Sequence, residues 1–117
     1  MELSALIEQQ VERDRRRGFP VDFASDSERL NQLMRDLVGL LGEVGEFANL
    51  LKKVGLAHST PGYVAPLLSE VNAELREELA DVAIYLFRLV TILDGDLERD
   101  ILRKVGINDE RYRDLER

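Results

Sequence analysis

Apolar residues recur along most of this chain at intervals of three and four, the spacing that places them on one face of an α-helix. The longest pattern covers residues 26–54 and forms one broad stripe: Leu30, Leu33, Leu37, Leu40, Leu41, Val44, Phe47, Ala48 and Leu51. Ser25 followed by Glu28 has the spacing of a capping box, which places the start of this helix near Asp26. Gly55 is expected to end it.

The most apolar stretch covers residues 79–93, LADVAIYLFRLVTIL. Its polar side chains are few: Asp81, Arg88, Thr91 and the tip of Tyr85. A helix here is apolar nearly all the way round, and such a helix belongs in a protein interior. At ~1.5 Å per residue it spans about 22 Å and carries two charges, so it does not suit a membrane crossing. The pattern predicts a buried third helix that begins near Pro66.

Shorter helical patterns lie at both ends of the chain. Residues 2–17 predict a first helix, which Gly18 interrupts. Asp96 is expected to cap a fourth helix that ends at Gly106, and a last turn or two is expected to start at Asn108.

Residues 55–64 read as a loop that carries His58, and no stretch alternates polar and apolar residues as a strand does. We therefore predict an all-α fold in one domain over residues 1–117. The expected architecture is an antiparallel four-helix-type bundle with long second and third helices. Its 117 residues, 44% hydrophobic, suffice for one modest core.

Composition excludes several classes of function. There is no cysteine and only one histidine, so a disulfide framework, a thiol nucleophile and a zinc site of cysteines or several histidines are excluded within one chain. The N-terminal MELSALIEQQ lacks the features of a signal peptide, so a cytoplasmic location is expected. A net charge of −7 argues against a nucleic-acid-binding surface. A phosphate-bearing ligand remains possible where carboxylates hold a divalent cation.

Two acid pairs, Glu43 with Glu46 and Glu78 with Asp81, lie near the middle of the two long helices. Each pair spans one helical turn, and helices joined by a loop can pack antiparallel, so the four carboxylates can converge. Carboxylate-bridged di-iron bundles pair glutamate with histidine at this spacing, and neither pair contains histidine. Oxygen-only ligands favour Mg²⁺, with Mn²⁺ as a substitute.

Gly42 precedes the first acid pair, and Gly45 lies between its two members. A glycine inside a helix costs about 1 kcal/mol relative to alanine, so we interpret these two as positions that another group approaches closely. The alternative interpretation of the acids is a solvated helix face whose glutamates bind nothing.

The segments LGEVGEFA (41–48) and EELADVAIYL (77–86) resemble the paired signature, EExxE…ExxD, of the MazG-like all-α nucleoside triphosphate pyrophosphohydrolases. The resemblance covers roughly residues 30–111. It implies that all four acids bind metal and that a nucleoside triphosphate is cleaved between its α and β phosphates, giving a monophosphate and pyrophosphate. It also implies a homodimer or homotetramer with sites completed across the interface. Gly42 stands where the signature has its first glutamate.

The resemblance also implies roles for individual residues. Glu43 or Glu46 is expected to orient the attacking water or take its proton. Residues that match the phosphate or sugar contacts of the family are Lys104, Asn108 and Arg111. Lys53 is a further candidate for phosphate binding, although a cationic helix end explains it equally well.

Two other functions stay open at this stage. One is a non-catalytic helical oligomerisation module, and the other is a degenerate member of the family that binds nucleotide or metal without turnover. Converging carboxylates repel one another, so stabilisation of the fold by Mg²⁺ distinguishes a metal site from scattered surface acids. No nucleic-acid or membrane partner is expected.

Overall fold

The computed structural model describes residues 2–116, which form helices and no β-strand. The elements are α1 (Leu3–Arg16), α2 (Asp26–Ser59), α3 (Leu68–Ile92), α4 (Leu97–Arg111) and a short 3-10 helix, η1 (Arg113–Leu115). The predicted all-α class is confirmed.

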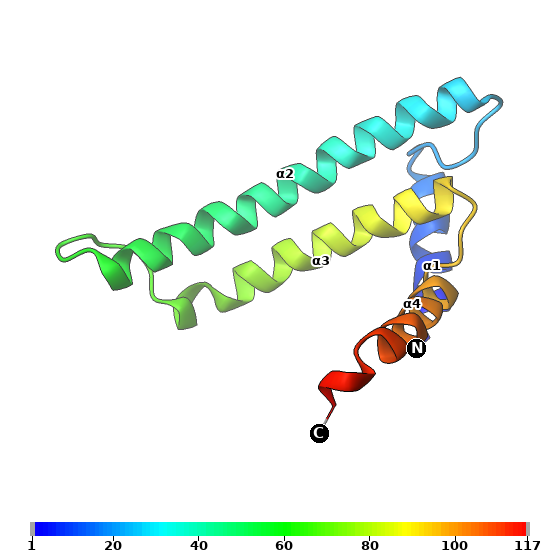
Figure 1. Ribbon diagram of the computed structural model, residues 1–117. Coiled ribbons are helices and arrows are strands. Elements are labelled where there is room, and N and C mark those ends of the chain that lie inside the picture. The colour runs from blue at the N-terminus through cyan, green and yellow to red at the C-terminus, as the bar shows by residue number, and fades with distance from the viewer. Residues whose placement is uncertain (1, 117) are drawn as a thin grey trace.

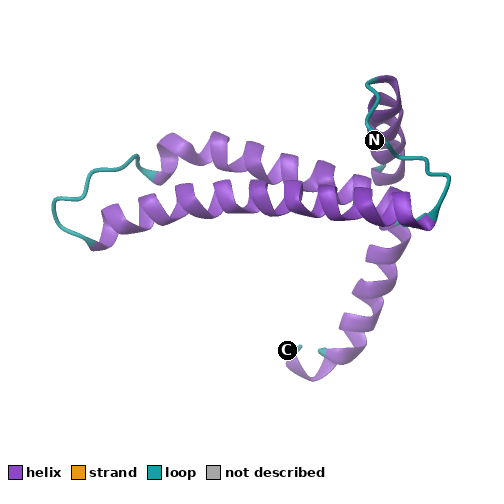
Figure 2. Cartoon of the chain, turned by 90° about the horizontal axis from the view of Figure 1, so that it is seen from above, coloured by secondary structure: helices purple, strands orange, loops and turns teal. Residues whose placement is uncertain are grey.

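The two long helices, α2 and α3, lie side by side and antiparallel, and they form the longest part of a molecule that measures 56 × 44 × 29 Å (Figure 1). α1 and α4 lie at the end of this hairpin where α3 finishes (Figure 2). The predicted long second and third helices are therefore confirmed. Among the helices of residues 2–116, none combines the length and the apolar character that a membrane crossing requires.

Two helix starts were predictable because their caps are local. The hydroxyl of Ser25 accepts a hydrogen bond from the backbone N–H of Glu28 at 3.2 Å, at the start of α2. A carboxylate oxygen of Asp96 accepts one from the N–H of Arg99 at 3.0 Å, at the start of α4. Each bond satisfies a donor that the first turn of a helix leaves without a partner.

The predicted ends of the second and fourth helices are wrong. α2 continues through Gly55 to Ser59, so His58 is helical, and α4 continues through Gly106 to Arg111, so Asn108 lies inside it. A glycine ends a helix when it adopts a positive φ, and among the described glycines only Gly18 and Gly62 do so.

The third helix begins at Leu68, two residues after Pro66, which was expected inside its first turn. The side chain of Glu70 accepts a hydrogen bond from the backbone N–H of Leu67 at 3.1 Å and so caps the start of α3. Because Glu70 caps Leu67, the residue after Pro66, the helix starts after Leu67.

The apolar core is split into two clusters, one toward each end of the hairpin. Near α1 the buried residues are Ile7, Val11, Val21 and Phe87, and near the α2–α3 loop they are Val54, Val71 and Leu75. Large apolar residues of α2 and α3 remain exposed within the described chain, among them Leu30, Met34, Leu37, Val38, Leu41, Leu79 and Leu86. Within residues 2–116 α3 is only partly covered, because α1 and α4 lie at one end of the hairpin.

Candidate functional site

Three of the four predicted acids meet between the long helices. Glu43 and Glu46 come from α2 and Glu78 from α3, and one carboxylate oxygen of each lies within 4.8 Å of those of the other two. Glu43 and Glu46 are one turn apart on α2, so they face α3 together. We call these residues the glutamate cluster.

The cluster changes the protonation of Glu78. A hydrogen bond with Glu43, burial, and the neighbouring Glu46 together raise the pKa of Glu78 from 4.5 to about 7. Two carboxylates share a hydrogen bond only while one of them holds a proton. The buried Oε2 of Glu78 has no hydrogen-bond partner among residues 2–116. A buried carboxylate oxygen without a donor, in an oxygen-only set, fits a hard divalent cation such as Mg²⁺ or Mn²⁺.

Asp81 does not join the glutamate cluster in this structure. It is exposed, one turn beyond Glu78 on α3, and it lines a neighbouring cavity to which Glu43 also contributes. Glu43 therefore connects the cluster to this cavity.

The cavity shared by Glu43 and Asp81 has a volume of about 400 Å³. α1, α2 and α3 all line it, and its polar wall includes Gln10, Asp14, Asp36 and Arg88. Its size lies within the range of about 300–1,000 Å³ that small-molecule sites occupy. We call it the hairpin cavity.

Within residues 2–116, and apart from the backbone of α2 itself, no atom lies within 4 Å of a Cβ placed at Gly42 or Gly45, so the close approach predicted there is not made by the described chain. The close approach occurs instead at Gly39, where a Cβ would overlap the ring of Tyr85. Tyr85 also lines the hairpin cavity. No charge or motif in the sequence marks the contact between Gly39 and Tyr85, so it was not predicted.

The predicted substrate-binding residues lie in two places. Lys53 lines a cavity of about 230 Å³ together with Glu46 and Glu78, so it stands beside the glutamate cluster. Those on α4, by contrast, line neither this cavity nor the hairpin cavity: Lys104, Asn108 and Arg111. The guanidinium of Arg111 lies over the ring of Tyr112, 5.2 Å from its centroid.

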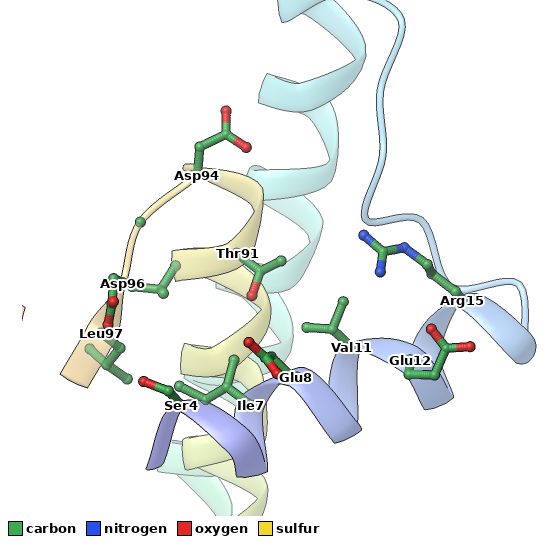
Figure 3. Close-up of a pocket in the computed structure, with 12 residues that line it drawn as sticks. Ser4, Ile7, Glu8, Val11, Glu12, Arg15, Thr91, Asp94, Asp96 and Leu97 are labelled. Atoms are coloured by element: carbon green, nitrogen blue, oxygen red, sulfur yellow. The ribbon is translucent and has the colours of Figure 1, made fainter. Parts of the chain in front are cut away.

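A larger cavity of about 610 Å³ lies elsewhere, between α1 and the turn that joins α3 to α4 (Figure 3). Glu8, Glu12, Asp94 and Asp96 line it over an apolar floor. No member of the glutamate cluster lines it, so its size does not make it the candidate site.

By its fold and site, this chain is a helical hairpin in which both long helices contribute carboxylates beside a cavity large enough for a small-molecule ligand. Comparison with curated proteins is consistent with that class. The chain is 37% identical over 98 residues to dCTP pyrophosphatase 1 of Rattus norvegicus and to that of Homo sapiens, and 35% identical to that of Mus musculus. Each match covers 82% of this chain and 56% of the relative, so the chain spans about half the length of the curated relatives it matches.

Over the matched region the chain is similar to dCTP pyrophosphatases, and this similarity supports the resemblance of its signature segments to the MazG-like all-α nucleoside triphosphate pyrophosphohydrolases. No protein-family profile matches the chain, and no solved structure does.

Proposed function

We propose that this chain is a divalent-metal-dependent nucleoside triphosphate pyrophosphohydrolase. It cleaves a nucleotide between the α and β phosphates, releasing a nucleoside monophosphate and pyrophosphate. The observation that carries the proposal is the glutamate cluster beside the hairpin cavity. The relatives named dCTP pyrophosphatase support the same reaction.

Glu43, Glu46 and Glu78, with Asp81 beside them, are the residues that would hold Mg²⁺ or Mn²⁺. When bound, the ion neutralises phosphate charge and lowers the pKa of a water molecule. Glu78 gives up the proton that it holds near neutral pH, which makes its Oε2 available as a ligand. Glu46, the exposed member of the cluster, orients the attacking water or accepts its proton, and Glu43 is the second candidate for this role.

The hairpin cavity is the proposed seat of the nucleoside, because Glu43 and Asp81 place it directly beside the metal ligands. Lys53 contacts the phosphates from the other side of the cluster. Deoxycytidine triphosphate is the first substrate to test, since the curated relatives are named for it.

A homodimer or homotetramer is part of the proposal. The exposed apolar side chains of α2 and α3 form a surface that a second copy of the chain would cover. Lys104, Asn108 and Arg111 would then reach substrate across the interface, since in the described chain they do not line the site cavities. A cytoplasmic role in maintaining nucleotide pools, without nucleic-acid or membrane partners, completes the proposal.

Pyrophosphate release from canonical ribo- and deoxyribonucleoside triphosphates with Mg²⁺ tests the function. Glu43→Gln and Glu46→Gln should each lower kcat/KM by at least about 10²-fold, the scale on which removal of one electrostatic contact to a transition state acts. Glu77→Gln is the matched control, because Glu77 is an exposed neighbour of Glu78 outside the cluster. Excess chelator should abolish turnover.

Two results would overturn parts of this proposal. Turnover that persists in chelator would show that the acids do not act through a metal. Stabilisation by Mg²⁺ without turnover of any canonical or modified nucleotide would instead identify a binding protein of this family. A Mg²⁺ concentration about 100 times Kd should stabilise the fold by about 2.7 kcal/mol, which a melting experiment detects.

A further inference from the structure

Arg88 is a buried arginine of α3 whose guanidinium joins three other segments of the chain. Its Nε donates to Oδ2 of Asp36 on α2 at 2.9 Å, and its Nη1 donates to Oδ2 of Asp14 on α1 at 3.1 Å. Its Nη2 donates to the carbonyl oxygen of Pro20, between α1 and α2, at 2.6 Å. Exposure is 6% for Arg88, 5% for Asp36 and 2% for Asp14, so the three charges are removed from water together.

The other oxygens of the two aspartates are satisfied as well. Gln10 donates to Oδ1 of Asp14 and Gln32 donates to Oδ1 of Asp36, each at 3.1 Å from one turn earlier on the same helix. A buried ion pair of this kind is weak evidence for stability, because removing the charges from water offsets most of their attraction. Its better-attested effect is to select one arrangement of the elements that it joins.

The Arg88 network has a fixed relation to the proposed metal ligands. Asp36 precedes Glu43 by seven residues on α2, and Arg88 follows Asp81 by seven residues on α3. Seven residues are two helical turns, or about 10.5 Å, so each network residue lies on the same helix face as its acid. All four of these side chains line the hairpin cavity. The Asp36–Arg88 pair therefore marks one axial register of α3 against α2, two turns from the acids.

We propose that Arg88 is a positioning residue that fixes the axial register of α3 against α2 and so brings Glu78 and Asp81 opposite Glu43 and Glu46. This inference rests on the proposed function, because it assigns Arg88 a role at the same metal site. The role is indirect: the guanidinium bonds to Asp14, Asp36 and Pro20 and acts on the acids through the backbone of α3. Misplacement of reacting groups by about 1 Å can lower a rate by about 10²-fold, so a small slide of α3 suffices.

Four variants separate positioning from a purely structural role. Arg88→Met removes the guanidinium, and Arg88→Lys keeps the charge but cannot reach three acceptors with a planar fork. Arg29→Met is the matched control, since Arg29 also joins α2 to the end of α3, through an exposed pair with Asp94 at 3.4 Å. Gln32→Ala removes only the outer hydrogen bond to Asp36 and serves where Arg88→Met does not fold.

The first readout measures register without activity. Because the chain has no cysteine, Lys52→Cys on α2 and Arg76→Cys on α3 can carry a pair of spin labels at exposed positions. Arg88→Met, or Gln32→Ala in its place, should shift or broaden the distance distribution between the labels, whereas Arg29→Met should not. An unchanged distribution in a folded Arg88→Met variant would overturn the proposal.

The second readout is Mn²⁺ binding without nucleotide, followed by electron paramagnetic resonance, together with kcat and KM well below the lowest melting temperature. Arg88→Met should weaken Mn²⁺ binding by about 10-fold and lower kcat by up to about 10²-fold, with Arg88→Lys between it and the parent chain. Normal Mn²⁺ affinity and kcat in a variant that only melts earlier would show a structural role and reject the proposal. A parent chain that hydrolyses no nucleotide refutes the proposed function alone, because the spin-label distances still test the register.

Discussion

Gly39 of α2 lies against the ring of Tyr85 of α3, so closely that a methyl group on Gly39 would overlap the outer atoms of the ring. Gly39 is one turn before Glu43, and Tyr85 is one turn after Asp81. The absence of a side chain at Gly39 therefore determines where the tyrosine stands in the wall of the hairpin cavity. Glycine lowers helix propensity, and its contact with Tyr85 gives a physical reason for a glycine at position 39 of α2.

Gly39→Ala should displace the ring of Tyr85 and impair substrate binding. Alanine favours the helix by about 0.5–1 kcal/mol, but overpacking opposes it by about 1–3 kcal/mol, so we expect a small net loss of stability. KM should rise about 10-fold, as for loss of a positioned side chain in a pocket. The checks are steady-state kinetics and a thermal melt.

Gly42→Ala is the matched control, because it lies one turn away on the same helix with no described atom within 4 Å of its Cβ. It should keep its kinetics and melt at the same temperature or higher. If the two variants behave alike, Gly39 does not position Tyr85.

The raised pKa of Glu78 predicts a specific dependence of stability on pH in the metal-free protein. The folded chain keeps a proton up to about pH 7 that the unfolded chain releases near pH 4.5. The folded state therefore binds more protons between these values, so the free energy of unfolding falls as pH rises through this interval and levels off above it.

Melting temperatures of the parent chain and of Glu78→Gln, recorded in chelator from about pH 5 to about pH 8, isolate this effect. The parent should lose stability relative to Glu78→Gln as pH rises, and Mg²⁺ should reverse the loss only in the parent. Parallel curves for the two proteins would mean that Glu78 does not titrate in this range.

Local rules explain which parts of the fold were predictable. Ser25 and Asp96 each bond to a backbone N–H three residues later, so their caps could be read from neighbouring residues alone. Gly55 and Gly106 were misjudged because a glycine ends a helix only when the following chain imposes a positive φ, and that depends on tertiary packing.

The candidate site was also predictable only in part. The meeting of Glu43 with Glu78 followed from two long helices joined by a short loop. The axial register of α3 against α2 depends on long-range contacts, among them those of Arg88 with Asp14 on α1 and Asp36 on α2. A charged residue inside the most apolar stretch was the available signal for Arg88, because a buried arginine needs acidic partners.

The exposed apolar surface of α2 predicts self-association. Val38 is 69% exposed on α2, among other exposed apolar residues of this helix. Val38→Glu should shift the oligomer toward monomer in sedimentation velocity, since a charge at the centre of an apolar interface is unfavourable. Val64→Glu, at a valine that is 93% exposed between α2 and α3, is the control and should leave the mass unchanged. A monomeric parent chain would contradict the proposed oligomer.

Asp81 is exposed and forms no ion pair within residues 2–116, and the buried arginine nearest to it along α3, Arg88, is bound to Asp14 and Asp36 instead. Asp81→Asn therefore leaves no buried charge without a partner. The metal-free variant should melt as the parent does, within about 0.5 kcal/mol, as is usual for surface substitutions.

As a metal ligand, the carboxylate of Asp81 is nevertheless required for turnover, so Asp81→Asn should abolish metal-dependent pyrophosphate release while the fold is preserved. Glu78→Gln, on the same turn of α3, should lose activity as well but gain metal-free stability above about pH 7, because it removes the carboxylate repulsion within the cluster. The measurements are one melt and one pyrophosphate assay for each variant. An Asp81→Asn protein that melts as expected and retains full activity would confine metal binding to the three glutamates and remove Asp81 from the site.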